Sequence, residues 1–247
     1  MKSQSLWGFL CMLMLFSSCQ KDLPTDRSAY YEGVPVKITP DLDGKADEAC
    51  WSVAKWYPID QVWAGEPTTK EDFNGRFKVA WSKDFIYLLV EITDDSLSDK
   101  RLNSLDTFWE DDGLNIYIDE DHSGGEHELS HNAFAYHLAL DGNVIDKSPD
   151  NSFLFYNHVT TVRVCEGNKC TWEIAIGVFN DTFDDFSTND QIQLETGKRL
   201  GFALSYYDND GGKLRDNVFG SVPIPGGDPD VADKNADVFG TLELKYE

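Results

Sequence analysis

The sequence predicts an all-β protein, folded as a single-domain antiparallel β-sandwich with layers of the jelly-roll or immunoglobulin-like type. Short segments with alternating apolar and polar residues follow one another along the chain, separated by Gly, Asn or Asp turns. No helical pattern of about 20 residues and no internal repeat interrupts them. The 247 residues, 41% hydrophobic and 13% aromatic, suffice for one large β-rich domain.

The alternation identifies the expected strands in chain order. Residues 76–81 place Phe77 and Trp81 on one face and Lys78 on the other, which predicts a half-buried strand. Residues 85–90 are apolar on both faces, which predicts a central strand. Further strands are expected at 114–118, 134–140, 144–145, 202–206 and 238–244, with a hairpin at 162–176.

The first residues have the features of an export signal. Residues 1–18 carry one charge, Lys2, before an apolar run that is too short to span a bilayer. Residues 15–19 resemble a bacterial lipobox, which implies cleavage before Cys19 and lipid attachment to it. Residues 20–22 resemble the start of the surface-export signal of Bacteroidetes lipoproteins. The alternative is a plain secreted protein in which Cys19 occurs by chance.

These features divide the chain into a signal peptide at 1–18, a tether at 19–34 and a β-sandwich at 35–247. We expect a lipid-anchored protein of the outer membrane, exposed at the cell surface, with the lipid as its sole membrane attachment. The formal charge of −23, from 21 basic and 44 acidic residues, repels phosphate backbones. We therefore expect no nucleic-acid partner.

Two cysteines of the exported chain are placed to form a disulfide. Cys165 and Cys170 flank residues 166–169, the loop of the predicted hairpin, and so lie opposite each other on its two strands. Export to an oxidising compartment favours the bond.

Five segments, in this order and spacing, resemble carbohydrate-binding module family 9: residues 43–51, 77–88, 109–119, 172–176 and 239–240. The resemblance covers about residues 36–246. It implies a β-sandwich that binds carbohydrate at the cell surface without catalysis, so the protein is not expected to be an enzyme. The implied partner is an oligosaccharide or the end of a polysaccharide chain.

The resemblance also implies where the sugar binds. In this family two tryptophans clamp a terminal sugar, and a Glu six residues after the first Trp accepts hydroxyl protons. Trp109 matches the first Trp, Asn115 stands at the Glu position, and Tyr117 lies on the same outward face as Asn115. No Trp occurs at 218–240, where the second is expected, so Trp63 or Tyr207 is the candidate for the second aromatic wall.

An acidic loop predicts structural calcium. Asp119, Asp121 and Ser123 offer oxygen atoms at alternate positions, and Glu126 or Glu128 could complete the ligand set. Calcium is common in the family that the chain resembles, so the resemblance implies it here too. The alternative is a solvated acidic loop without metal.

One motif suggests an enzyme instead. His127, Glu128 and His131 form H-E-x-x-H, which with His137 nearly completes the signature of a zinc metallopeptidase. The strand expected at 134–140 would remove His137 from the helical register that the signature needs, which favours a chance match. A third possibility is a β-sandwich that serves only as a structural scaffold.

Overall fold

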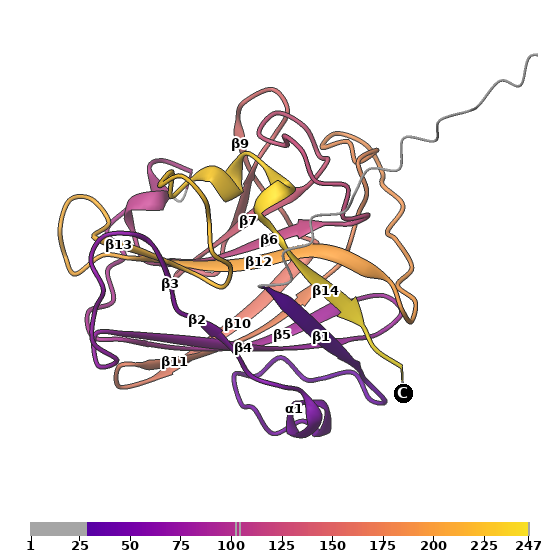
Figure 1. The fold of residues 1–247 in the computed structure, drawn as a ribbon, viewed down its shortest axis with the longest axis horizontal. Helices are drawn as coiled ribbons and strands as arrows, with labels where there is room; N and C mark the ends of the chain where they lie inside the picture. Colours follow the sequence, from indigo (N-terminus) through magenta and orange to yellow (C-terminus); the bar gives the residue numbers. More distant parts are fainter. Residues whose placement is uncertain (1–28, 102, 104, 247) are drawn as a thin grey trace, which may run out of the picture.

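Strands make up nearly all of the regular structure in the computed structural model, which describes residues 29–246 except 102 and 104 (Figure 1). The predicted signal peptide and Cys19 lie outside the described residues. Among the described residues, no helix is long and apolar enough to cross a membrane.

The strands form two layers, with β1 (Tyr30–Pro35) between them at one side (Figure 1). The upper layer contains β3 (Gln61–Ala64), β6 (Gly113–Asp119), β7 (Phe134–Ala139), β8 (Val144–Lys147), β9 (Phe153–Phe155), β12 (Arg199–Asp208), β13 (Asn217–Gly220) and β14 (Gly240–Leu244). The lower layer contains β2 (Tyr57–Ile59), β4 (Phe73–Trp81), β5 (Ile86–Asp94), β10 (Val159–Glu166) and β11 (Lys169–Ile176). The short helices are α1 (Ala49–Val53), η1 (Phe108–Glu110), η2 (Val231–Asp233) and η3 (Ala236–Val238).

β1 joins the two layers into one continuous sheet. Its first residues pair with β14 and its last two with β4, and both pairings are parallel. The predicted β-sandwich is confirmed, but it is mixed rather than purely antiparallel. Residues 30–34, which the sequence assigned to the tether, belong to the folded domain. Parallel pairing brings together partners far apart in the chain, so no turn next to β1 indicates it.

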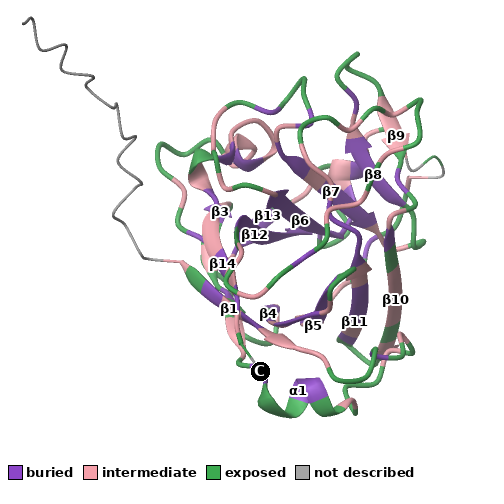
Figure 2. Ribbon diagram, turned by 90° about the vertical axis from the view of Figure 1, so that its right-hand side faces the viewer, coloured by how far each residue is buried: buried purple, intermediate pink, exposed green. Residues whose placement is uncertain are grey.

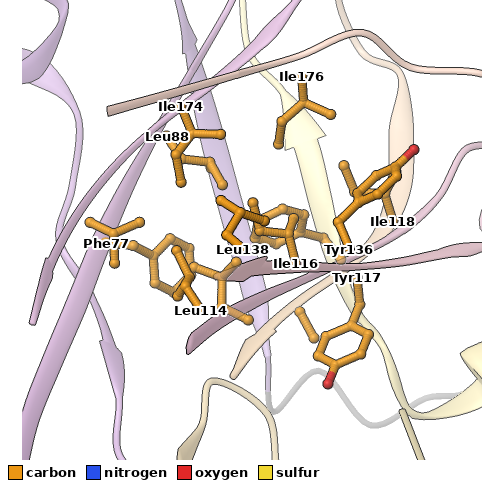
Figure 3. Close-up of a cluster of buried hydrophobic side chains, with 14 of the residues drawn as sticks. Phe77, Leu88, Leu114, Ile116, Tyr117, Ile118, Tyr136, Leu138, Ile174 and Ile176 are labelled. Carbon is orange, nitrogen blue, oxygen red and sulfur yellow. The ribbon is translucent and has the colours of Figure 1, made fainter. Parts of the chain in front are cut away.

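Apolar side chains from both layers fill the space between them (Figure 3). Phe77 and Leu88 enter from the lower layer, and Leu114 and Ile116 enter from the upper layer, all without solvent exposure. Tyr117 points to the other side of β6 (Figure 3). The alternation along β6 therefore separates the core face from an outer face, as the sequence predicts.

α1 covers part of the outer face of the lower layer (Figure 1), with one side buried and the other exposed (Figure 2). The indole Nε1 of Trp51 donates to Glu173 Oε1 at 3.2 Å, and the backbone N–H groups of Asp43 and Gly44 donate to Oε2 at 2.9 and 2.8 Å. Glu173 is fully buried, and these three donors satisfy its carboxylate. Trp51 is therefore part of the scaffold.

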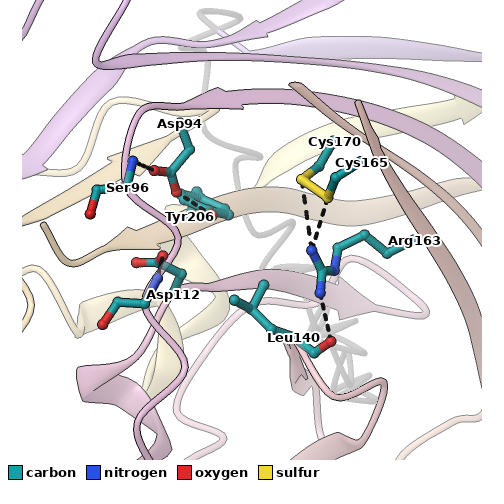
Figure 4. The surroundings of a disulfide bond; sticks show 9 residues. Asp94, Ser96, Asp112, Leu140, Arg163, Cys165, Cys170 and Tyr206 are labelled. Atoms are coloured by element: carbon teal, nitrogen blue, oxygen red, sulfur yellow. Dashed lines mark hydrogen bonds between the residues drawn. A yellow bond between two sulfur atoms is a disulfide. The ribbon is translucent and has the colours of Figure 1, made fainter. Parts of the chain in front are cut away.

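A disulfide closes the hairpin of β10 and β11 (Figure 4). Cys165 and Cys170 lie opposite each other with an S–S distance of 2.01 Å. The Arg163 guanidinium donates to Cys165 Sγ at 2.9 Å and to the Leu140 carbonyl oxygen at 2.9 Å. It thus ties the hairpin to the end of β7. Cys50 is a buried free thiol.

We expect the double variant Cys165→Ala/Cys170→Ala to lose about 2 kcal/mol of unfolding free energy, the low end for a disulfide because the closed loop is short. Urea denaturation measures the loss. Reductant should lower the stability of the native protein by the same amount and leave the stability of the double variant unchanged. Both proteins keep Cys50, so any effect of reductant on this thiol would appear in both. Equal stability of the native protein with and without reductant would contradict the prediction.

Candidate functional site

A cavity of about 210 Å³ lies on the outer face of the upper layer. Residues of β6, β7 and β12 line it from the sheet, while η1 and the segment containing η2 line it from the loops. Its volume is below the 300–1,000 Å³ or so of pockets for drug-sized ligands. The cavity therefore suits a compact ligand of one or two rings.

Hydrogen-bonded polar side chains form the sheet side of the cavity. Asn115 of β6 lies opposite His137 of β7 and Ser205 of β12. Its Nδ2 donates to Ser205 Oγ at 3.0 Å, and its Oδ1 lies 2.8 Å from His137 Nδ1. Asn115 and His137 line the cavity although each is at most 3% exposed. They lie at the bottom of the cavity, not at its rim.

His137 presents an unused hydrogen-bond acceptor. Because Asn115 Oδ1 can only accept, His137 Nδ1 must carry the proton and donate it. Burial lowers the pKa of His137 to about 3, so the ring is neutral near pH 7 and Nε2 keeps its lone pair. This Nε2 is buried without a hydrogen-bond partner among the described residues. A ligand hydroxyl that donates to Nε2 would satisfy it, which favours binding because an unpaired buried acceptor costs about 1–3 kcal/mol.

Aromatic side chains form a wall beside His137. Phe108 lies 4.6 Å from the His137 ring between centroids, and its ring meets Trp109 edge-on at 5.1 Å. Phe153 of β9 packs on Trp109 at 5.8 Å. Trp109 and Phe153 are half-buried and line the cavity, so aromatic surface remains open to a ligand.

The charged groups that line the cavity largely neutralise one another. Arg215 forms an ion pair with Asp230, and Lys147 forms one with Glu128 at 2.8 Å. Both pairs are at least partly exposed, so they contribute little to stability. Their balance favours a neutral polar ligand over a strongly charged one.

Tyr207, whose ring centroid lies 5.6 Å from that of His137, is held in place by polar contacts. Its hydroxyl donates to Asp233 Oδ2 at 3.2 Å, and the Arg215 guanidinium carbon lies 4.3 Å from its ring centroid. Burial and then repulsion from Asp230 raise the pKa of Asp233 to about 6. Tyr207 lines the cavity while only 3% exposed, so it shapes the wall without offering an open platform.

The structure brings Trp109 and Asn115 together at the cavity but places Tyr117 and Trp63 elsewhere. Tyr117 is fully buried, and its hydroxyl lies 3.1 Å from Ser205 Oγ. Trp63 is 6% exposed, its Nε1 donates to the Val222 carbonyl oxygen at 2.8 Å, and its ring packs on Gly220 of β13. Neither residue lines this cavity, because strand pairing and loop packing cover both. A sugar contact by Tyr117 or Trp63 stays a prediction.

The residues of the H-E-x-x-H motif do not converge. Residues 127–131 form turns rather than a helix. His127 Nε2 lies 3.0 Å from the Ala232 carbonyl oxygen, and His131 Nε2 lies 3.1 Å from Asp185 Oδ2. Glu128 pairs with Lys147 at the surface. The zinc hypothesis needs one helix face with both imidazoles on it, and the fold does not supply that face.

The predicted calcium loop engages its oxygens in other contacts. Asp119 Oδ2 and Asp121 Oδ1 each accept a backbone N–H of the loop, at 2.8 and 3.0 Å. The Ser123 backbone N–H is the donor to Asp121, and Glu126 Oε1 accepts from the amide of Asn235 at 2.8 Å. Among the described residues, Asp119 Oδ1 is buried without a hydrogen-bond partner. Three other places in the described chain gather three acidic ligand atoms within 4.8 Å, and none includes these residues. Calcium in this loop stays a prediction.

Fold and site together define a class of protein. A β-sandwich with a small cavity, an aromatic wall and buried hydrogen-bonding groups has the architecture of a carbohydrate-binding module. The chain belongs to the family described as "Carbohydrate family 9 binding domain-like", whose model matches residues 42–247. The family resemblance found in the sequence is thereby confirmed.

Solved structures of similar fold include two of a carbohydrate-binding module of family 9 from Caldicellulosiruptor kristjanssonii. The complex with cellotriose has a TM-score of 0.64 and 18% identity, covering 88% of this chain and 94% of that one. The complex with glucose has a TM-score of 0.63 and 19% identity, covering 87% of this chain and 96% of that one. A Bacteroides uniformis protein proposed to bind carbohydrate has a TM-score of 0.58 and 13% identity, covering 88% of this chain and 99% of that one. At these identities the likeness establishes the fold. No curated protein matches the sequence.

Several cavity residues were not singled out by the sequence. His137 was considered only as a zinc ligand, although the outward faces of the strands expected at 114–118 and 134–140 carry Asn115 and His137. Antiparallel pairing of those two strands would place Asn115 and His137 side by side, so this pairing was the signal that could have linked the two residues. Phe153 lies in a three-residue strand and Arg215 in a loop, so neither has a periodic pattern that indicates its position.

The lowered pKa of His137 predicts a pH dependence. Between about pH 6.5 and 3 the unfolded imidazole binds a proton that the folded one does not, so native stability falls as pH decreases. The contribution of His137 approaches 1.4 kcal/mol per pH unit, roughly the value for one proton. In His137→Phe this contribution disappears. Urea unfolding across this range should therefore show a shallower acid slope in the variant, and parallel profiles would contradict the prediction.

Proposed function

We propose that this protein binds a neutral oligosaccharide, or the end of a polysaccharide chain, without catalysing a reaction. The observation that carries the proposal is the cavity that is lined both by half-buried Trp109 and by His137, whose Nε2 has no hydrogen-bond partner among the described residues. A sugar ring has an apolar face of C–H groups and a rim of hydroxyls, so it complements both features. Family membership supports binding without catalysis.

The size of the cavity supports recognition of a chain end. A volume of about 210 Å³ accepts few sugar rings, so a long polymer would enter by its end. The related module is bound to cellotriose in one structure and to glucose in another, which supports glucose-type sugars as the first ligands to test.

His137 takes the acceptor role that the family resemblance assigns to a Glu at position 115. Asn115 brings no charge, and its oxygen already accepts from His137. The acceptor that faces a hydroxyl is then a neutral imidazole nitrogen, whose hydrogen bond is weaker than that of a carboxylate. We expect dissociation constants of order 0.1–1 mM.

Replacing Trp109 by Ala should weaken binding of glucose and cellotriose about tenfold, because stacking on the indole contributes about 1–2 kcal/mol. Isothermal titration calorimetry measures the change. Trp56→Ala is the matched control: Trp56 is also half-buried, but it lies outside the cavity beneath Arg76 and Lys78. Equal affinity of Trp109→Ala and Trp56→Ala across a glycan panel would refute the role of Trp109.

A deoxy-sugar series tests His137. The monodeoxy-glucose that lacks the hydroxyl bonded to Nε2 should bind the native protein about tenfold more weakly than glucose, because it leaves the buried acceptor unpaired. His137→Phe should bind glucose and this analogue alike. If the variant keeps the full discrimination of the native protein at every hydroxyl, His137 is not the acceptor.

We also propose that Cys19 carries lipid and anchors the protein at the surface of the outer membrane. The lipobox-like residues 15–19 support the proposal, together with a folded domain that begins close after them. The anchor would hold the cavity near polysaccharide outside the cell.

Cys19→Ala should abolish incorporation of a labelled fatty acid and release the protein from the membrane fraction, because a single lipidated cysteine supplies the attachment. Cys50→Ala, which removes a buried thiol of the folded domain, should keep the label. Label that persists in Cys19→Ala would contradict the anchor.

A further inference from the structure

The strand at the edge of the upper layer carries an exposed aromatic side chain. This strand, β9, pairs with β8 on one side, and its other edge is unpaired among the described residues (Figure 2). Its first residue, Phe153, is half-buried and lines the cavity. Its last residue, Phe155, is 54% exposed. The proposed function gives Phe155 no role.

Strand register places Phe155 on the face of the sheet that bears the cavity. His137 of β7 lies opposite Ile145 of β8, and Ile145 lies opposite Phe155 of β9. Residues that lie opposite each other on neighbouring strands point to the same face of a sheet. Phe155 therefore shares the outer face with His137. Since neighbouring strands are about 4.8 Å apart, two strand spacings, or about 10 Å, separate the backbones at these two positions.

The same register makes Phe155 the neighbour of the aromatic wall. Phe153 lies opposite Lys147, which also lines the cavity. Alternate residues of one strand point to the same face and are about 6.6 Å apart along it. This step is comparable to the width of one sugar ring with its hydroxyls. Phe155 thus extends the aromatic surface of Phe153 beyond the cavity, along the edge of the sheet.

The partly exposed side chains that line the cavity are of two kinds. Glu128 and Asp230 are charged and already form ion pairs with basic neighbours. Trp109 and Phe153 are aromatic. The C–H face of a sugar ring stacks on an aromatic ring and gains little beside a hydrated charge. A sugar chain that leaves the cavity is therefore stabilised most where the aromatic surface continues, which is at Phe155.

We propose that Phe155 is a second stacking platform, which binds the sugar rings that follow the chain end held in the cavity. This inference rests on the proposed function. A cavity of about 210 Å³ holds one or two rings, so the rest of an oligosaccharide must lie outside it. A ring that stacks on Phe155 removes exposed aromatic surface from water. The phenyl side chain has two rotatable bonds and stands on a strand, so its ordering costs little.

The platform makes affinity depend on the length of the sugar chain. Rings inside the cavity contribute equally to the binding of short and long chains. A ring on Phe155 contributes only when the chain is long enough to reach it. The protein would thereby favour polysaccharide ends and longer oligosaccharides over free glucose or a disaccharide, which suits the capture of polymer rather than of its final breakdown products.

The test measures dissociation constants of glucose, cellobiose and cellotetraose by isothermal titration calorimetry, for the native protein and three full-length variants. Phe155→Ala removes the platform, and Phe155→Tyr keeps an aromatic ring there. Phe85→Ala is the matched control, because Phe85 is also exposed, at 36%, but directly precedes β5 in the lower layer. All replaced side chains are exposed, so the Tm of each variant should equal that of the native protein.

The native protein should bind cellotetraose about fivefold more tightly than cellobiose, a factor that corresponds to about 1 kcal/mol of stacking on one ring. Phe155→Ala should bind these two sugars alike and keep the native affinity for glucose, because the cavity is unchanged. Phe155→Tyr and Phe85→Ala should keep the fivefold gain.

Two results would overturn the platform while leaving sugar binding in the cavity intact. One is equal affinity of the native protein for cellobiose and cellotetraose, and the other is a gain that persists in Phe155→Ala. Loss of the gain in Phe85→Ala as well would also contradict a role specific to Phe155. If the native protein binds none of the three sugars, the proposed binding of glucose-type sugars fails, and the platform fails with it.

Discussion

Burial of both faces of β6 is the constraint on which the site depends. All seven residues from Gly113 to Asp119 are buried, because the core covers one face and loops cover the other. Polar side chains on the covered outer face lose water and must bond to protein. Asn115, Ser205 and His137 satisfy one another except at Nε2 of His137. The unpartnered acceptor of the cavity thus follows from covering the second face of the sheet.

The acidic excess of the protein is unevenly distributed. At the cavity, Arg215 and Lys147 pair with acidic neighbours, which leaves the site close to neutral. At the end of the sandwich, Asp94 and Asp208 face Asp112, and none of the three forms an ion pair with a basic side chain of the described chain. The first arrangement suits an uncharged ligand, whereas the second concentrates carboxylates at one buried place. The formal charge of −23 alone does not distinguish these two environments.

This chain shares the β-sandwich fold of its family but differs from the family pattern at position 115. A TM-score of 0.64 at 18% identity shows that the β-sandwich persists through extensive substitution. Asn115 replaces the Glu that the family resemblance implies at this position, and the proposed acceptor moves across the strand pair to His137. Such a shift keeps the acceptor within the same cavity while changing its charge, which alters the hydrogen-bond strength available to a sugar.

The sequence by itself determined the strands with regular alternation and the Cys165–Cys170 pair. It also placed Trp109 just before a strand and Asn115 on the outward face of that strand. All of these depend on neighbours close along the chain. Tertiary structure decided which outward faces are covered, so that Glu173 lies under α1 and Asn115 lies beneath loops. It also decided the parallel pairing of β1 and the meeting of Asp94 with Asp208. These features depend on contacts between distant segments, which local periodicity does not encode.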